Sequence, residues 1–444
     1  MTPQVLAERS VPRPFQQFFR TEAAGGAMLL VAAVLALAIA NSPWAEAYER
    51  LWHLPISIAA AGHGLSLTLR QWINDALMAV FFLLVGLEIK RECVAGELAA
   101  PRLAALPIAA AVGGMVVPAA IFGAFTFGRP AADGWAIPMA TDIAFALGTL
   151  SLVAPQAQLS AKVFLSALAI VDDLGAVVVI AFFYSQALSW SALAGVAAIL
   201  MVLVGMNRAG VRRLSLYLVL GVALWWFVHE SGLHATVAGV LLAMTIPTRS
   251  RINAAQFSTE VRGLVDEFDR AETGDYLVLT SKGQQEALFA IERASEGVAE
   301  PLLRLEHALH TVSAFAVMPL FALANAGVAM TVSVPDPGLA AGTILGLTIG
   351  KPVGITLAAW LVVRSGWADL PRGMSWLTLH ACGWLGGIGF TMSLFVATLA
   401  FAGTPLLDAA KTAVMAGSLI AGGIAAALLR RDRLEYRPSD DAAV

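Results

Sequence analysis

Residues 163–184 read VFLSALAIVDDLGAVVVIAFFY, an apolar run of 22 residues with two adjacent carboxylates, Asp172 and Asp173, at its centre. A bilayer core about 30 Å thick is crossed by roughly 20 apolar helical residues, so this run predicts a membrane-spanning helix. The two carboxylates then lie near mid-membrane. Ionisable groups are costly to insert there, and they often mark an ion or proton pathway.

The composition of the whole chain favours the same class of protein. Its 444 residues are 58% hydrophobic and 13% charged, whereas a soluble domain has about 25% charged residues. Twelve apolar stretches lack the period-two alternation of a membrane barrel, so we expect an all-α polytopic membrane protein with twelve transmembrane helices. Numbered as spans 1 to 12 in chain order, they are Ala23–Ala40, Trp72–Leu87, Leu103–Phe127, Trp135–Val153, Val163–Tyr184, Ala187–Met206, Leu214–Val228, Gly232–Pro247, Thr311–Met330, Gly338–Val363, Leu377–Ala402 and Ala409–Leu429.

The loop charges predict the orientation of these spans. Alternate loops, together with both terminal segments, hold 23 of the 28 Lys and Arg residues, which places both termini in the cytoplasm. Span 1 could instead be a signal peptide cleaved after Ala38-Ile39-Ala40. However, its 18 apolar residues exceed the usual ~7–15 of such peptides.

Four segments follow from this pattern. They are spans 1–8 in residues 1–247, a polar cytoplasmic insertion at 248–305, spans 9–12 in 306–430, and a cytoplasmic tail at 431–444. Within the insertion we expect two modest helices, Asn253–Arg270 and Gly283–Glu296. A net charge of −3 leaves no broad basic surface for nucleic acid, and two cysteines are too few for a disulfide framework.

Two further charges lie near mid-membrane. Asp142 is residue 8 of the 19 in span 4, and Lys351 is residue 14 of the 26 in span 10. A buried ion pair that only fixes helix packing would use one acid and the lysine, and would leave two carboxylates without a partner. Adjacent helical residues point about 100° apart, so one aspartate of the pair can face a cavity while the other faces Lys351. Protons and cations would then compete for the same oxygens.

Two of the spans contain residues that interrupt helices. Span 4 has Pro138 just before Thr141 and Asp142, and span 11 reads GWLGGIGFT at 383–391. Close packing of helices on small residues is an alternative explanation for these glycines. Spans 4 and 11 are the middle members of units 3–5 and 10–12, and the offset of seven spans reverses orientation. We therefore expect inverted repeats with discontinuous crossed helices, whose terminal half-charges Asp142 and Lys351 would offset.

Eight blocks of the sequence resemble one family, the NhaA-type sodium/proton antiporters. The match covers nearly the whole chain except the insertion. The blocks are Trp72–Asp75, Gly86–Glu92, Ala140–Phe145, Val171–Gly175, Ser231–Thr236, Leu305–His307, Gly350–Gly354 and Gly389–Ser393.

This resemblance implies an electrogenic, pH-regulated antiporter, not an enzyme, that exchanges cytoplasmic Na⁺ or Li⁺ for external H⁺ by alternating access. It implies a bacterial inner membrane, often a homodimer, and no cofactor. Asp172 and Asp173 would form the shared cation and proton site, with Lys351 as the partner of Asp172. Thr141 and Asp142 would lie at the crossed helices. Regulation by pH would map onto Glu88, Arg91, Glu92, His234, Glu306 and His307.

Simpler roles and other functions stay open at this stage. The charges from Glu88 to Glu92 suit a helix end that reaches the membrane surface. His234 could be a cap or a packing residue, and Asp75 could be structural.

An intramembrane aspartyl protease needs two acids that face each other, and a channel favours rings of charge around a symmetric pore. One asymmetric cluster fits alternating access better than either.

Overall fold

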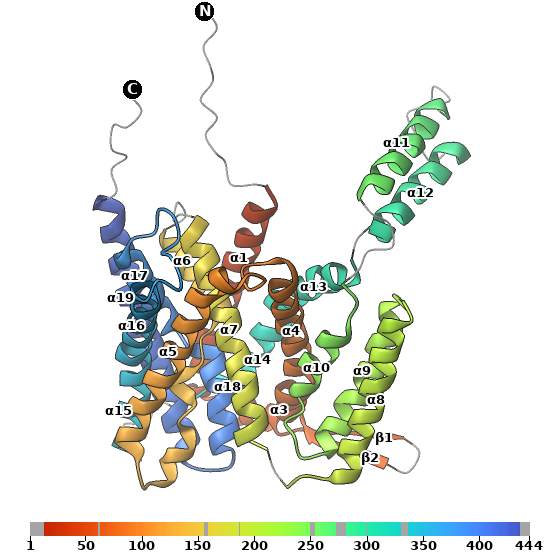
Figure 1. Cartoon of the computed structure of the whole chain (residues 1–444). Helices are drawn as coiled ribbons and strands as arrows, with labels where there is room; N and C mark the ends of the chain where they lie inside the picture. Colours follow the sequence, from red (N-terminus) through yellow and green to blue (C-terminus); the bar gives the residue numbers. More distant parts are fainter. Residues whose placement is uncertain are drawn as a thin grey trace, which may run out of the picture.

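The structure, a computed structural model, describes residues 13–435 apart from 61–62, 155–158, 186, 249–253, 272–280, 299 and 330–335. Most of the described chain is α-helical (Figure 1). The first half contains α1 (Arg13–Ala40), α2 (Ala45–Trp52), α3 (Leu69–Trp72), α4 (Met78–Ala95), α5 (Pro101–Thr126), α6 (Ile143–Val153), α7 (Leu159–Phe183), α8 (Trp190–Arg208), α9 (Leu214–Glu230) and α10 (Val237–Thr245). The second half contains α11 (Ala254–Arg270), α12 (Lys282–Val298), α13 (Pro301–Val312), α14 (Met318–Asn325), α15 (Pro337–Leu345), α16 (Lys351–Arg364), α17 (Trp376–Gly386), α18 (Phe390–Phe401) and α19 (Leu406–Glu435).

Several of these helices join end to end through short segments of other helical geometry. Three are π-helical: η1 (Ile73–Leu77) connects α3 to α4, η5 (Ser313–Val317) connects α13 to α14, and η6 (Gly346–Gly350) connects α15 to α16. Two are 3₁₀ segments before α6, namely η2 (Pro130–Gly134) and η3 (Ile137–Met139). A π-helical turn places extra backbone in the helix, and such turns are frequent at functional sites.

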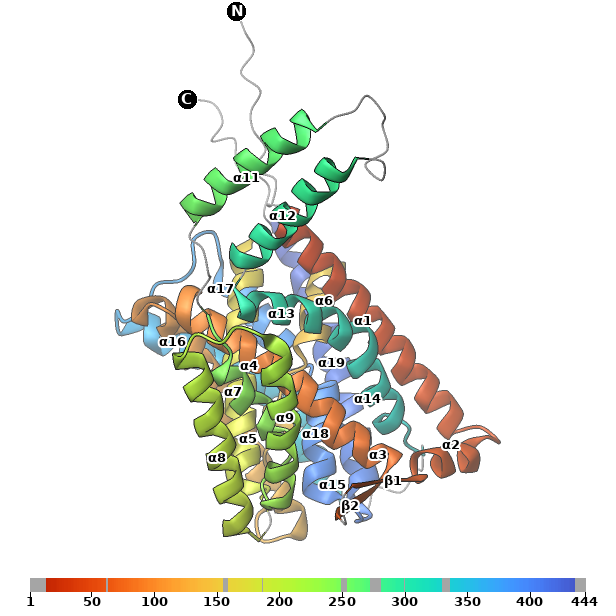
Figure 2. The same ribbon diagram turned by 90° about the vertical axis from the view of Figure 1, so that its right-hand side faces the viewer.

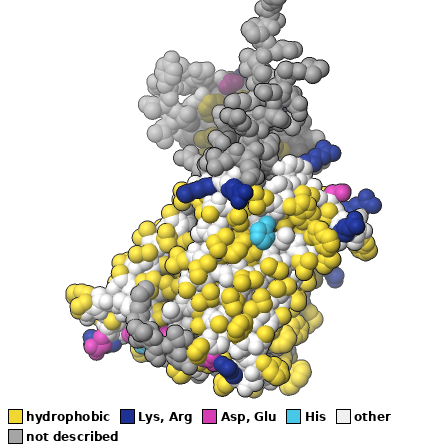
Figure 3. Space-filling view, turned by 90° about the vertical axis from the view of Figure 1, so that its left-hand side faces the viewer, with side chains coloured by type: hydrophobic (Ala, Val, Ile, Leu, Met, Phe, Trp, Pro, Cys, Tyr) yellow, Lys and Arg dark blue, Asp and Glu magenta, His cyan; other side chains and the backbone are white. Residues whose placement is uncertain are grey.

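The helices confirm a polytopic helical membrane protein. Within the described residues, seven helical stretches are long and apolar enough to cross a bilayer, or up to ten if each bent pair counts as one span. The broad apolar surface of one face, with basic side chains along its upper margin, agrees with this (Figure 3). The number twelve stays a prediction, because α9 has 17 residues and α10 only 9.

A small β-hairpin is the exception to the all-α expectation. Strands β1 (Pro55–Ala60) and β2 (His63–Thr68) pair antiparallel, with Ser57 opposite Ser66. Their hydroxyl groups are 2.8 Å apart. The segments 56–58 and 65–67 read Ile-Ser-Ile and Leu-Ser-Leu, the alternation typical of strands. This short signal was missed because it lies between two membrane-length apolar runs.

Two chain breaks meet in the interior. The pair Pro130–Met139 and Ile143–Val153 bends by 43°, and the pair Trp376–Gly386 and Phe390–Phe401 bends by 42°. Pro138 helps to explain the first break, because proline lacks a backbone N–H and restricts the residue before it. At the second break, an added Cβ on Gly389 would lie 2.9 Å from the Ala140 oxygen of the first. Small residues therefore let the two breaks touch.

Helix α7 lies inside the bundle, whereas α8 lies at its edge (Figures 1 and 2). In their most apolar stretches, 61% of α7 residues are buried against 17% for α8. The described start of α1 and end of α19 lie at one end of the bundle, where α11 and α12 also project from it. The β-hairpin lies at the opposite end.

Candidate functional site

An ion pair between α7 and α16 occupies the interior of the bundle. Lys351 is 1% exposed, and Asp172 and Asp173 are each 2% exposed. The Lys351 Nζ atom donates to Asp172 Oδ2 at 2.6 Å. Because Lys351 is the first residue of α16, directly after η6, its position depends on that π-helical segment.

A second hydrogen bond connects the ion pair to both chain breaks. Lys351 Nζ donates to Thr141 Oγ1 at 2.8 Å. The Thr141 hydroxyl in turn donates to the backbone oxygen of Gly386 at 2.8 Å. Thr141 belongs to the break before α6, and Gly386 is the last residue of α17. The Thr141 hydroxyl therefore connects the lysine charge to a carbonyl at the C-terminus of α17, where the helix dipole favours a cation.

The Asp142 carboxylate lies between two helix N-termini. It accepts from the backbone N–H of Phe145 in α6 at 3.0 Å, and from the backbone N–H of Thr391 in α18 at 3.1 Å. The Thr391 hydroxyl donates to the same carboxylate. The backbone N–H of Asp142 donates to the Ile388 oxygen at 2.8 Å. A negative charge is favourable at both N-termini, so Asp142 stabilises the contact between the two breaks.

Two carboxylate oxygens near the ion pair have no hydrogen-bond partner among the described residues. They are Oδ1 of Asp172 and Oδ2 of Asp173, and both atoms are fully buried. Asp172, Asp142 and Glu88 also lie close enough to Asp173 to act on it electrostatically. Buried oxygens without donors are costly, and hard cations such as Na⁺ prefer oxygen ligands. The arrangement therefore suits a dehydrated cation or a proton.

A small cavity of about 50 Å³ approaches this region. Its walls include Glu88 of α4, His310 of α13 and Met392 of α18, and it reaches Asp142. Asp172 and Asp173 are not among its lining residues. Glu88 thus shares a cavity with Asp142, one of the four central charges.

The structure brings together part of the set expected to regulate by pH. Arg91 forms ion pairs with Glu92, at 3.0 Å, and with Glu306 of α13. Glu306 is 8% exposed, and its Oε2 atom is buried without a partner among the described residues. His307, the next residue of α13, is exposed, and within the described residues no ion pair joins it to this cluster.

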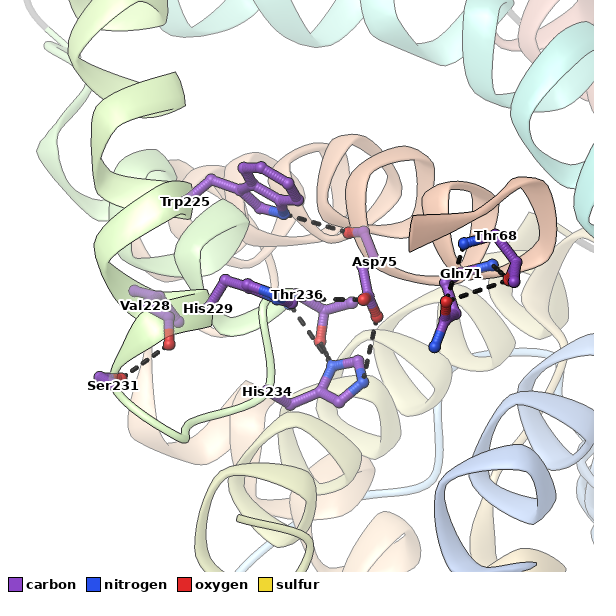
Figure 4. A network of polar contacts seen from close by, with 9 residues as sticks. All are labelled: Thr68, Gln71, Asp75, Trp225, Val228, His229, Ser231, His234 and Thr236. Carbon is purple, nitrogen blue, oxygen red and sulfur yellow. Dashed lines mark hydrogen bonds and ion pairs between the residues drawn. The ribbon is translucent and has the colours of Figure 1, made fainter. Parts of the chain in front are cut away.

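His234 lies in a different cluster, drawn in Figure 4. Its Nε2 atom is 3.7 Å from Asp75 Oδ1, and its Nδ1 atom is 2.8 Å from the Thr236 hydroxyl. His229 approaches the other Asp75 oxygen at 4.0 Å. Asp75 is 16 residues before Arg91 in the continuous helix made of α3, η1 and α4. This separation corresponds to about 24 Å along the helix axis. The two groups of candidates therefore lie at different depths.

Sequence reasoning missed several partners of the central charges. No role was assigned to Thr391, which donates twice to Asp142, or to the Gly386 carbonyl. His229, which lies beside Asp75, was also assigned no role. An aspartate directly before an apolar helix is a typical N-cap signal, so the capping role of Asp142 was readable. The contact with Thr391, 249 residues away, was not.

Comparison with known proteins gives a consistent result. A family model described as "Na+/H+ antiporter 1" matches residues 16–429. A Na(+)/H(+) antiporter NhaA of Oleidesulfovibrio alaskensis is 50% identical over 412 residues, which cover 92% of each chain. The protein of that name from Rhodospirillum rubrum is 47% identical and covers 94% of this chain and 96% of the relative. The one from Wolinella succinogenes is 45% identical, with coverages of 92% and 90%.

Proposed function

Because this chain belongs to the Na⁺/H⁺ antiporter 1 family, a family of transporters and not of enzymes, we propose that it exchanges cytoplasmic Na⁺ or Li⁺ for external H⁺. The exchange is electrogenic and proceeds by alternating access. The observation that carries this proposal is a pair of buried oxygens on Asp172 and Asp173, close to Lys351, that have no hydrogen-bond partner in the described part of the chain. They offer oxygen ligands to a cation and sites for protons at the same place.

In this mechanism the two aspartates have different tasks. Asp173 binds the cation, because its carboxylate is not engaged by Lys351 and still has a bare oxygen. Asp172 is held by Lys351 while no cation is bound. When Na⁺ enters, its charge replaces the ammonium group as the counter-charge of Asp172, and the protons held by Asp173 and by Lys351 leave the site. When protons return from the other side, Na⁺ is released and the ion pair reforms.

The proposed path of access uses the two chain breaks. Spans 4 and 11 act as discontinuous helices that cross at Asp142, within inverted repeats made of spans 3–5 and 10–12. The contacts of Asp142 with Phe145 and Thr391 support this, because they neutralise two half-helix ends inside the membrane. Rocking of the repeats about this contact would expose the aspartates to each side in turn.

Location and regulation complete the proposal. We infer a bacterial inner-membrane protein with twelve spans, both termini in the cytoplasm and a homodimeric assembly. The common position of the α1 start and the α19 end supports the placement of the termini. We also infer pH regulation through Glu88 and the cluster of Arg91, Glu92 and Glu306, beside the proposed cytoplasmic entrance. Roles for His234 and His307 stay predictions.

The decisive variant is Asp173→Asn, which keeps the shape of the side chain and removes its charge. Na⁺-dependent quench of a ΔpH dye in everted vesicles should fall to background across a pH series, with Na⁺, Li⁺ and K⁺ added separately. Asp133→Asn, an exposed carboxylate outside the site, is the matched control and should retain wild-type exchange. Substantial exchange by an Asp173→Asn protein that inserts normally would remove Asp173 from the cation site.

A further inference from the structure

A cavity of about 580 Å³ lies apart from the ion site, at the end of the bundle where α1 begins. It is formed by the α4–α5 connection, the first turns of α5 and α7, and the connection between α16 and α17. Figure 2 shows the two connections next to each other at the edge of the bundle. Its volume lies within the range of small-molecule sites, about 300–1,000 Å³.

Four charged residues line this cavity, and their charges balance. They are Glu97, Arg102, Asp369 and Arg372. Among the described residues, none of these four side chains forms an ion pair, either within the set or with another residue. Arg102, Asp369 and Arg372 are exposed at the rim and Glu97 is half-buried, so two cations and two anions face one cavity without forming ion pairs with each other. A ligand that carries both a positive and a negative group could offer an opposite charge to each of the four side chains.

The remaining walls of the cavity are largely apolar and continue onto the outer surface of the bundle. Leu106, Pro107 and Phe164 line the interior. At the margin, Trp367 is 73% exposed and Leu103 is 57% exposed. Tryptophan favours the depth of lipid headgroups. Leu159, at the start of α7, is 39% exposed and also lines the cavity, so the margin offers apolar side chains to the first part of an acyl chain.

We propose that this cavity binds a zwitterionic phospholipid whose headgroup ends in a primary ammonium, as in phosphatidylethanolamine. Arg102 and Arg372 bind the phosphate, and Glu97 and Asp369 accept hydrogen bonds from the ammonium. The acyl chains leave the cavity past Leu103, Leu159 and Trp367. An acidic lipid without an ammonium group would leave both carboxylates facing an anion. A choline headgroup has no N–H to donate. The proposal rests on the membrane-spanning fold, and it holds whether or not the ion site acts as described above.

The test measures lipid retention by the full-length protein in detergent, using native mass spectrometry. Phosphatidylethanolamine, phosphatidylcholine and phosphatidylglycerol with identical acyl chains are offered at equal concentration. We expect wild-type protein to retain phosphatidylethanolamine about tenfold better than the other two, because charge-assisted hydrogen bonds are lost with each of them. Glu97→Gln/Asp369→Asn should abolish the preference over phosphatidylcholine. Arg102→Gln/Arg372→Gln should reduce retention of all three lipids.

Arg208→Gln, an exposed arginine at the end of α8 outside the cavity, is the matched control and should retain the wild-type preference. Soluble glycerophosphoethanolamine should not displace the lipid, because it lacks acyl chains. Equal retention of the three lipids by wild-type protein would overturn the proposal. So would an unchanged preference in Glu97→Gln/Asp369→Asn, stronger retention of phosphatidylglycerol, or displacement by the soluble headgroup.

Discussion

Lys351 is the residue on which the geometry of the central site depends most. Its ammonium group has two hydrogen-bond partners, Asp172 and Thr141, and the side chain is almost closed to solvent. An ion pair at this depth need not stabilise the fold more than apolar residues would. Removal of one partner, however, leaves the other as a buried charge without compensation. The pair is therefore sensitive to single substitutions and tolerant of a matched double substitution.

We predict that Lys351→Ala lowers the stability of the protein, by about 3–5 kcal/mol if Asp172 stays charged. The apparent Tm in detergent measures this effect. The same variant should change the charge moved per cycle, which current recordings on proteoliposomes detect. Lys351→Met/Asp172→Asn should recover much of the lost Tm, because both charges are then absent. A Lys351→Ala protein with wild-type Tm and wild-type charge transfer would contradict a functional ion pair.

At the scale of elements, helix α16 is held in place by its close approach to α5. A Cβ atom added to Gly113 of α5 would lie 2.2 Å from the Gly354 oxygen, and one added to Gly354 would lie 2.1 Å from the Gly113 oxygen. Each glycine therefore makes room for the backbone of the other helix. This contact lies three residues beyond Lys351, so it also sets the distance of the ammonium group from α7.

Gly113→Ala should therefore force α5 and α16 apart and destabilise the protein by about 1–3 kcal/mol. Gly123→Ala is a control in the same helix, because an added Cβ there meets nothing within 4 Å. We expect that control to be neutral or slightly stabilising, since alanine favours helix by up to about 1 kcal/mol. Thermal unfolding of the two variants side by side measures the difference. Equal Tm values for the two variants would show that α5 and α16 can move apart without loss of stability, and would contradict the prediction.

At the scale of the whole molecule, the described part of the insertion consists of two helices, α11 and α12, that pack against each other. Its two ends meet, because the backbone N–H of Leu302 donates to the Pro247 oxygen at 3.3 Å. Helices α11 and α12 project from the bundle (Figure 1). Residues 254–300 carry ten acidic and four basic side chains, a net charge of −6. Glu306 follows Leu302 by four residues, so the electric field of the acidic insertion can act on the Arg91–Glu306 ion pair.

We predict that replacement of Ala254–Glu300 by a short Gly/Ser linker preserves maximal exchange and moves the pH of half activation. The shift should be largest at low salt, because exposed charges are screened over about 8 Å at physiological ionic strength. Dye quench at two salt concentrations measures it. The matched variant keeps the hairpin and converts six exposed carboxylates to amides: Glu260, Asp266, Glu267, Asp269, Glu286 and Glu292.

The linker variant removes both the charge and the volume of the insertion, whereas the amide variant removes only its charge. If charge is responsible, both variants shift the profile equally. An unchanged profile at low salt in both would reject the regulatory role. Loss of exchange in a normally inserted linker variant would instead make the insertion part of the transport machinery.

The sequence by itself determined the class of the protein and the identity of its central charges. Apolar runs of membrane length dictate helices, because backbone groups in lipid must bond internally. Asp142, Asp172, Asp173 and Lys351 stand out because charges are rare at that depth. Helical periodicity left open which aspartate meets the lysine, because two adjacent side chains on one helix are equivalent until a neighbouring helix packs against one of them. The family resemblance implied Asp172, and the tertiary structure pairs Lys351 with that residue. It also brought the breaks before α6 and α18 together, separated His234 from the Arg91 cluster, and placed four charges around one cavity. These contacts join residues far apart in the chain, and local periodicity carries no information about them.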